Sequence, residues 1–239
     1  MMKTSKLFFG AFLMMSALLG FTSCEDDNEN TTYGSGIVTL KPNTDNSSWF
    51  LQLNDSTKLV PSNIKQSPFG TKELRAYVVY SDPVRLNSTA GREYQVNIMS
   101  IDTILTKPLA ENLITADTEW AEEDSANFKA YGTDPVEIID SWETVAEDGY
   151  LTLRFRTTFA GIKPHRVNLV HRNDLANPYV LEFFHDAMGE EGGQLTDGLA
   201  AFRLSDFFNM GDEPITITLK WSSFSGEKTK TFKYSPRKD

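Results

Sequence analysis

Apolar and polar residues alternate along the stretch ITITLKW, residues 215–221. Successive side chains of a strand point to opposite faces, so its isoleucines, leucine and tryptophan would share one face. The turn signal Ser-Gly-Glu at residues 225–227 leads into a second run, residues 228–234, with weaker alternation and several lysines. We expect a hairpin whose first strand lies in a core and whose second strand is a protected edge.

The rest of the C-terminal half has the same character. Turn signals rich in Gly, Asn and Asp separate short runs of β-branched and aromatic residues, which is typical of strands. Further strands are expected at residues 136–139, 142–145, 150–158, 166–171, 179–185 and 199–204. One turn of helix is expected at residues 205–208. About seven or eight short strands at this spacing predict a β-sandwich over residues 134–239.

The N-terminal half is also built from period-two runs. Strands are expected at residues 37–40, 49–53, 58–60, 74–80 and 94–106, with Asp82-Pro83 and Gly91 bounding a loop. Five strands without a helical stretch favour a small closed barrel of the oligonucleotide/oligosaccharide-binding (OB) type over residues 35–108. The complete expectation is an all-β chain, in which a five-stranded OB-like barrel precedes a C-terminal β-sandwich. The barrel label describes topology only and implies no nucleic-acid binding.

The segment between these two blocks, residues 109–133, has no clear period. It turns acidic from Asp117 to Asp124 and ends near Gly132 and Pro135. Linkers tend to be polar and rich in Pro and Gly, so we expect residues 109–133 to be a linker.

The N-terminus has the features of an export signal. Lys3 and Lys6 precede an apolar run that stops after residue 21, whereas a membrane-spanning helix needs about 20 apolar residues. Small residues then stand directly before Cys24, the only cysteine, and resemble a bacterial lipobox. We expect residues 1–23 to be a lipoprotein signal peptide and Cys24 to carry the lipid. The alternative is an ordinary signal peptide followed by a chance cysteine.

An acidic, asparagine-rich stretch follows Cys24, and we expect residues 24–34 to form a tether. Its acidic residues, 25–29, resemble the tract that directs some lipoproteins to the outer face of the outer membrane; the alternative is that they only keep the tether solvated. The expected location is the cell envelope, with the lipid in the outer membrane and the folded part exposed at the surface.

Charge and cysteine content exclude several functions. The chain carries 23 basic and 33 acidic residues, a formal charge of −10, and loss of the signal peptide removes Lys3 and Lys6 and no acid, which leaves −12. So acidic a chain is a poor partner for nucleic acid, because binding rests on Lys and Arg neutralising phosphates. With Cys24 under lipid, the folded part has no disulfide and no thiol nucleophile.

All three histidines lie in one region, at His165, His171 and His185. A metal or acid–base cluster is one interpretation, since strands can bring His and carboxylate ligands together. The other is that they end core-facing rows and hydrogen-bond to the backbone. We favour the second, because their spacing matches no metal motif, and neither HExxH nor GxSxG occurs. No catalytic residue, metal or cofactor is therefore expected.

The tryptophans divide into two classes. Trp49 and Trp221 fall on apolar strand faces, so we expect them in cores. Trp120, which lies among acidic residues, and Trp142, whose face is ambiguous, are the candidate ligand-binding residues. Exposed aromatic rings could contact a glycan or a protein partner.

Several short motifs occur together in an order that resembles one known family. They are Cys24 in its lipobox, GIV at 36–38, DPV at 134–136, DGYLTL at 148–153, HRVNLV at 165–170 and LEFFHDA at 181–187. As a set they are similar to the NigD-like lipoproteins of anaerobic bacteria. The resemblance implies an N-terminal barrel, a C-terminal β-sandwich and no established activity. It associates an immunity or accessory role with a bacteriocin gene cluster, and it supplies no site residues.

The favoured functional hypothesis is a non-enzymatic, lipid-anchored envelope protein that binds an unknown partner, as a bacteriocin-associated immunity or accessory protein would. The alternative is a surface lipoprotein that binds carbohydrate. A hydrolase using the histidines and nearby carboxylates such as Glu182 and Glu190 is the third, because a glycosidase needs two carboxylates about 5–10 Å apart, which sequence cannot establish.

Overall fold

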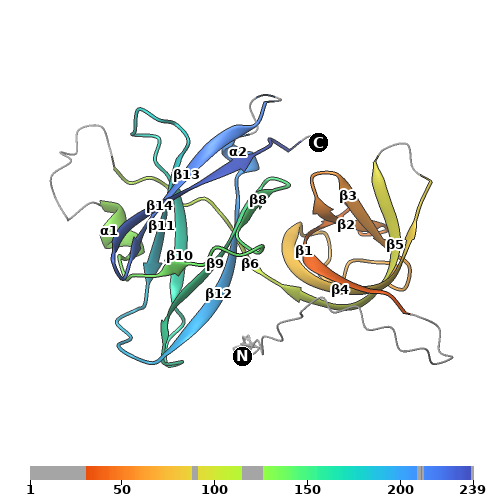
Figure 1. Ribbon diagram of the computed structural model, residues 1–239, viewed down its shortest axis with the longest axis horizontal. Helices are drawn as coiled ribbons and strands as arrows, with labels where there is room; N and C mark the ends of the chain where they lie inside the picture. Colours follow the sequence, from red (N-terminus) through yellow and green to blue (C-terminus); the bar gives the residue numbers. More distant parts are fainter. Residues whose placement is uncertain (1–30, 88–90, 115–125, 209–210, 212, 238–239) are drawn as a thin grey trace, which may run out of the picture. The chain divides into compact units, whose positions relative to one another are not determined.

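The computed structural model describes residues 31–87, 91–114, 126–208, 211 and 213–237. Nearly all regular structure in these ranges is β-strand (Figure 1), which confirms the all-β prediction. The expected signal peptide and most of the tether lie outside the described residues.

The N-terminal domain is a closed five-stranded barrel with the strand order β1-β2-β3-β5-β4. The strands are β1 (Tyr33–Pro42), β2 (Trp49–Asn54), β3 (Thr57–Pro61), β4 (Leu74–Arg85) and β5 (Arg92–Thr103). All neighbours pair antiparallel except β3 and β5, which pair parallel. The predicted OB-like barrel is confirmed.

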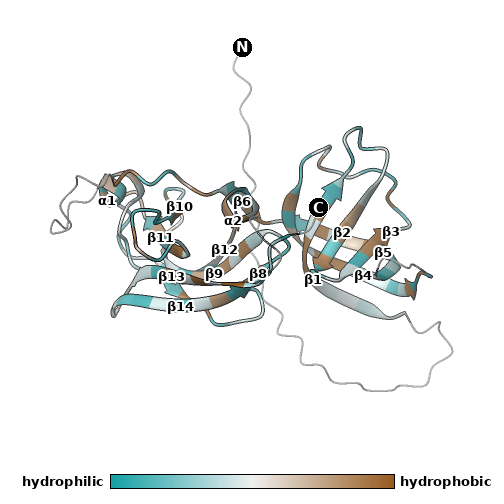
Figure 2. Cartoon of the chain, turned by 90° about the horizontal axis from the view of Figure 1, so that it is seen from above, coloured by the Kyte–Doolittle hydropathy of each residue, from teal (hydrophilic) through white to brown (hydrophobic). Residues whose placement is uncertain are grey.

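Alternation along the strands makes the barrel core. Val38 and Leu40 of β1 pack inward with Leu51 and Leu59, and all four are essentially buried. Apolar and polar segments alternate along the barrel strands in Figure 2. One expectation was wrong: Asp82-Pro83 lies inside β4, not in a loop, because an irregularity between Ser81 and Val84 lets the strand pass the proline.

The C-terminal domain is a sandwich of two sheets. One has the order β10-β11-β13-β14; the other has the order β6-β12-β9-β7, with β8 also paired to β9. The strands are β6 (Leu105–Pro108), β7 (Glu137–Ile138), β8 (Val145–Glu147), β9 (Tyr150–Phe159), β10 (Arg166–His171), β11 (Val180–Asp186), β12 (Gln194–Arg203), β13 (Ile215–Ser223) and β14 (Gly226–Tyr234). The predicted sandwich and the predicted helical turn, α2 (Ser205–Phe208), are both confirmed.

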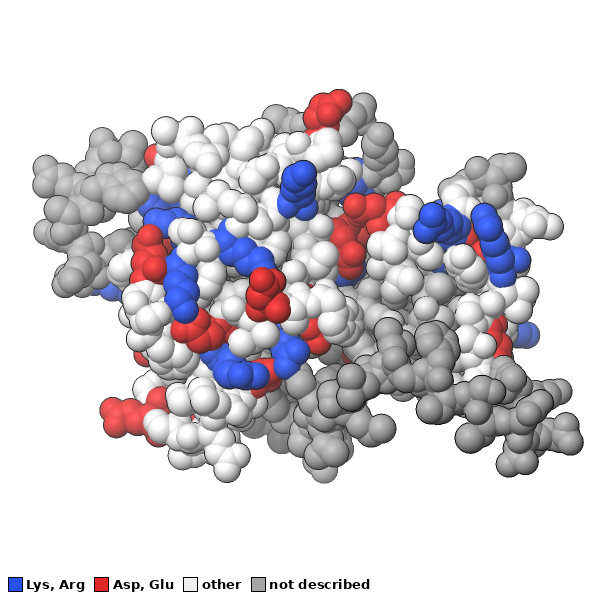
Figure 3. Space-filling view, viewed as in Figure 1, with Lys and Arg blue, Asp and Glu red and all other residues white. Residues whose placement is uncertain are grey.

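The stretch ITITLKW lies in β13 and has the expected faces. Ile217, Leu219 and Trp221 are buried in the sandwich core, whereas Thr216 is exposed. The β13–β14 hairpin forms as predicted, and Lys228 and Lys230 of β14 pair with Glu137 and with an aspartate in the loop after β7. Positive and negative side chains lie side by side on the face of the sandwich that Figure 3 shows. Such charges protect an edge strand from pairing with another chain.

Strands β9 and β12 are buried on both faces where they meet the barrel. Leu151 and Leu153 face the sandwich core, while Tyr150 and Ala201 pack with Ile37 of the barrel in a separate buried cluster. The two domains therefore share an apolar contact within the described chain.

Pieces of two expected segments pack in the sandwich. Residues 105–108, expected to end the barrel domain, form β6, which pairs parallel with β12. Within the segment expected to be a linker, residues 109–133, Ala110 bridges to β10. A helix, α1 (Ala126–Tyr131), then packs on β10 and β11. The sequence pattern joined the start of β6 to the strand expected at residues 94–106 and gave no sign of α1, because both elements are short and the partner of β6 lies far along the chain.

A second difference concerns residues 142–145, which were expected to be a strand. Residues 142–144 instead form a turn, and only Val145 belongs to β8. The Thr144 hydroxyl donates to the Ile139 carbonyl over 2.6 Å and so closes the loop of residues 139–144. No helix in the described residues is both long and apolar enough to cross a membrane.

Leu219→Ala should lower the free energy of unfolding by about 2–5 kcal/mol, because it empties fully buried volume in the sandwich core. Thr218→Ala, on the other face of the same strand, is the matched control and should cost much less. Denaturant titration of both full-length variants measures the difference. Equal costs would show that the register of β13 is wrong.

Candidate functional site

The fold brings together two of the three histidines. His165 lies just before β10 and His185 lies on β11, and their nearest ring nitrogens, Nδ1 and Nε2, are 2.9 Å apart. His171 ends β10, where its Nε2 lies 2.7 Å from the Pro178 carbonyl. The histidine contacts to backbone carbonyls agree with the favoured sequence interpretation, but the pairing of His165 with His185 was not predicted.

Donor counting assigns the protons in this cluster. His185 Nδ1 faces the Asp134 carbonyl at 3.2 Å and must donate, so in a neutral ring its Nε2 accepts from His165 Nδ1. His165 Nε2 faces a Glu190 carboxylate oxygen at 3.1 Å and must donate as well. Beside an ionised Glu190, the chain of contacts is complete when one of the two rings carries protons on both nitrogens. Burial lowers the pKa of His185, which disfavours a charge on that ring.

Glu190 closes the loop between β9 and β10. Its oxygens accept backbone N–H groups of Ala160, Ile162 and Lys163 at 2.7–3.0 Å, besides the contact with His165. Burial alone would raise the pKa of Glu190, but the three backbone hydrogen bonds and His165 outweigh it and lower the pKa to about 2. The carboxylate thus ties together two loops at one end of the sandwich.

This cluster has little capacity for chemistry. His185 is 2% exposed, and each ring nitrogen of both histidines already faces a hydrogen-bond partner. Within the described ranges, no group of three His, Cys, Asp or Glu side chains could hold a metal ion. The geometry is that of a structural clasp.

A small cavity lies where α1 and the segment before β7 cover the sandwich. Its volume is about 220 Å³, and its lining includes Phe128, Asp134, Glu182, His185 and Trp221. Small-molecule sites are usually about 300–1,000 Å³. Glu182 is also held by a charged hydrogen bond from Arg172, so it is not poised as an acid or a base.

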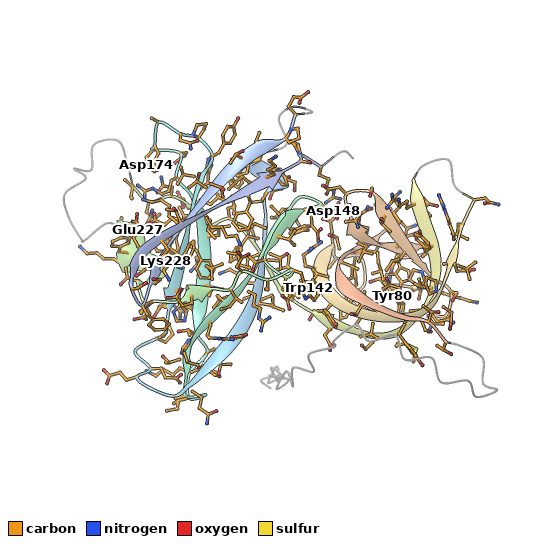
Figure 4. All side chains as sticks on the ribbon, viewed as in Figure 1. Tyr80, Trp142, Asp148, Asp174, Glu227 and Lys228 are labelled. Carbon is orange, nitrogen blue, oxygen red and sulfur yellow. The ribbon has the colours of Figure 1, made fainter. Side chains whose placement is uncertain are left out.

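A line of charged side chains runs along the contact between barrel and sandwich. Lys41 pairs with Asp148, which Figure 4 labels, at 2.6 Å, and Arg237 holds Glu73 with two hydrogen bonds of 2.6 and 2.8 Å. The Tyr150 hydroxyl donates to Glu73, and burial together with this carboxylate raises the pKa of Tyr150. Because these groups bind one another, this contact is structural.

Trp142 is different, because its ring is open to solvent. It stands in the loop of residues 139–144 with 57% of its surface exposed and is labelled in Figure 4. One side of the indole contacts Tyr77, with the ring centroids 6.2 Å apart and tilted by 44°. The residues on either side, Ser141 and Glu143, each carry a buried oxygen (Oγ and Oε2) that has no hydrogen-bond partner among the described residues.

Charged side chains extend from this loop across β9 and β12. Glu143 accepts from Arg154 at 3.3 Å, and Arg154 also donates to Asp197 at 2.6 and 2.9 Å. Arg156 donates to the same aspartate, and the hydrogen bonds from Arg156 and Arg154 lower the pKa of Asp197. The four side chains form a fixed array of donors and acceptors with no net charge.

The structure separates the tryptophans as follows. Trp49 and Trp221 are each 6% exposed, which confirms that they belong to the cores. Trp120 and Cys24 lie outside the described residues. Sequence reasoning singled out Trp142 but missed the array beside it, since Arg154 and Asp197 are 43 residues apart and meet only through strand pairing.

Two family profiles match the chain. Residues 37–104 match the NigD-like N-terminal OB domain, and residues 119–234 match the NigD-like C-terminal β-sandwich domain. Together they cover most of the chain and coincide with the two domains of the structure. No curated protein matches the chain significantly in sequence.

Solved structures share this two-domain fold. A candidate toxin-related protein from Parabacteroides distasonis is 28% identical, with 86% of this chain and 94% of that chain covered and a TM-score of 0.66. A NigD-like immunity protein from Bacteroides caccae is 18% identical (85% and 97% covered, TM-score 0.55). A candidate lipoprotein from Bacteroides fragilis is 12% identical (86% and 99% covered, TM-score 0.55). At these lower identities the likeness concerns the fold alone.

Glu190→Gln should lower the midpoint of thermal unfolding at neutral pH, because the amide group can donate but cannot replace the second acceptor oxygen. The pKa of Glu190 falls from about 4.3 in an unfolded chain to about 2 in the fold. A depressed carboxyl pKa stabilises the fold above the unfolded pKa, and this contribution is lost as the pH falls through the folded pKa.

The difference in the midpoint of thermal unfolding between the wild type and Glu190→Gln should therefore be largest above about pH 5. It should shrink as the pH falls toward 2. Thermal melts followed by circular dichroism across this range measure it, with Glu191→Gln, at an exposed neighbour, as the control. A gap that does not change with pH would show that Glu190 is not ionised in the clasp.

Proposed function

We propose, from the premise that this chain belongs to the NigD-like family, that it is a lipid-anchored protein of the cell envelope that acts by binding a partner and not by catalysis. The three solved structures named above are described as a toxin-related protein, an immunity protein and a lipoprotein, and none of the three as an enzyme. The absence of catalysis stays a prediction.

The observation that carries the proposal is the state of the best acid–base candidates. His165, His185 and Glu190 are bonded to one another and to backbone groups, and their nitrogens and oxygens already have partners. A general base needs a free position within about 2.6–3.2 Å of a substrate proton. The exposed Trp142, in contrast, leaves aromatic surface free to contact a ligand.

Two observations support the location. The likeness in fold to a candidate lipoprotein agrees with a place in the cell envelope. The small residues before Cys24 and the acidic residues after it support lipidation and exposure on the outer membrane. The likeness to a NigD-like immunity protein supports a role in resistance to a bacteriocin, as an immunity or accessory protein.

Metabolic labelling with a tagged fatty acid tests the anchor. The wild-type chain should take up the label and Cys24→Ala should not, because Cys24 is the only thiol that could accept the lipid. An immunoblot of both proteins controls for expression. Equal labelling of the two would refute the lipoprotein assignment.

Deletion of the gene in its own bacterium tests the immunity role. The deletion strain should become sensitive to culture supernatants of bacteriocin-producing strains of related bacteria. Complementation with the wild-type chain should restore growth, and complementation with Cys24→Ala should not, because the unanchored protein leaves the membrane. If the deletion strain resists every supernatant as well as its parent does, the immunity role is wrong.

A second function is favoured by Trp142 itself. An exposed indole beside fixed polar groups suits a surface lipoprotein that binds carbohydrate. The immunity role and the carbohydrate role both require binding, and they differ in the chemistry of the ligand.

A further inference from the structure

We propose that Trp142, with the array formed by Glu143, Arg154, Asp197 and Arg156, binds a neutral carbohydrate. This inference rests on the proposal that the chain acts by binding, and it names the ligand class and the site. It joins an open aromatic ring to a set of donors and acceptors that are already held in place.

The indole provides an apolar platform. Tyr77 contacts one side of the ring, and with 57% of the residue exposed, the remaining surface is open to a ligand. The axial C–H groups of a pyranose ring form a flat apolar face that stacks on such an indole. Aromatic rings suit this role, because they present a large contact area and lose little conformational freedom on binding.

The array provides polar groups that begin at the residue after Trp142. Glu143 follows Trp142 directly and connects through Arg154 to Asp197 and Arg156. Arg156 is the most accessible member, with 44% of its side chain exposed. A sugar hydroxyl both donates and accepts, so it can bond to a guanidinium and to a carboxylate. Because these groups already hold one another, binding would cost little side-chain entropy.

The loop also contains acceptors that need partners. Glu143 Oε2 and Ser141 Oγ are buried and have no hydrogen-bond partner among the described residues. Leaving such a group unpaired costs about 1–3 kcal/mol. Both oxygens belong to the residues that flank Trp142 in the chain, so this loop has hydrogen-bonding capacity that the described residues do not use.

Charge selects a neutral ligand over an anionic one. Both guanidinium groups are bonded to carboxylates, so the array carries no net charge. The whole chain has a formal charge of −10. A phosphate or an acidic sugar would have to displace Glu143 or Asp197 from its arginine, whereas neutral hydroxyls add to the array without breaking a pair.

The surroundings of the ring favour a sugar over a protein. The centre of a protein interface is depleted in charged residues, and a stable interface buries about 800 Å² on each partner. Here the one large exposed ring stands in a loop that also carries Asp140 and Glu143, and the loop is tied to the strand that carries Arg154 and Arg156. An isolated ring with a charged rim is too small an apolar surface for a protein hot spot.

A glycan array probed with the full chain in detergent tests the inference, using neutral and acidic oligosaccharides. The wild type should bind one or more neutral glycans. Trp142→Ala should weaken the apparent affinity at least about tenfold, and Trp142→Tyr should retain part of it. Phe224→Ala removes a comparably exposed ring (50%) from the β13–β14 hairpin and should leave binding unchanged. Equal melting temperatures for the four proteins would exclude misfolding.

Binding to acidic glycans alone, no glycan binding, or equal binding by Trp142→Ala would each overturn the inference. The supernatant assay separates its failure from that of the proposed function. If no glycan on the glycan array binds the chain, but Trp142→Ala fails to protect the deletion strain, then the Trp142 surface binds a protein. In that case only the assignment of a carbohydrate ligand is wrong. If no glycan on the glycan array binds the chain and Trp142→Ala protects the deletion strain fully, the Trp142 surface has no role in binding.

Discussion

The contact between the inner faces of the two sandwich sheets is the interaction on which the rest of the structure depends. Phe183 of β11 meets Phe155 of β9 and Phe202 of β12, with ring centroids 5.5 and 6.0 Å apart. No disulfide can reinforce this contact, because the only cysteine is Cys24. Each buried phenylalanine contributes about 1.5–3 kcal/mol. A Cβ at Gly198 would lie 2.5 Å from the Phe155 ring, so β12 needs glycine there.

This core fixes the loop that carries Trp142. Strand β9 supplies Phe155 to the core, and the backbone of its neighbour Arg154 accepts from Ile139 N–H at 2.8 Å and donates to the Thr144 hydroxyl at 3.2 Å. Both ends of the loop are thereby tied to a core strand, and Trp142 projects from a rigid support. Binding sites held in this way lose little freedom when a ligand binds. The loop between β9 and β10 is likewise held by hydrogen bonds, which its backbone N–H groups donate to Glu190.

The alternation of apolar and polar residues along the sequence predicted most of the fold, but it predicted little of the site around Trp142. The alternation in β13 and the bounds of β10 were readable because each strand buries one face. Strand β6 was not separated from the strand expected at residues 94–106, and helix α1 was missed, because both are short and β6 is defined by pairing with a distant strand. Trp142 could be singled out as ambiguous, but its array could not, since register places Arg154 beside Asp197. Cys24 and Trp120 lie outside the described residues and stay predictions.

The most direct test of binding through Trp142 is an NMR titration of the tryptophan indole N–H signals. The chain has four tryptophans, and Trp142→Phe assigns the signal of interest. When a neutral oligosaccharide identified on the glycan array is added, the Trp142 signal should shift, while the signals of the buried Trp49 and Trp221 should stay in place. A titration in which the Trp142 signal does not move, or in which the buried indoles move instead, would contradict the account.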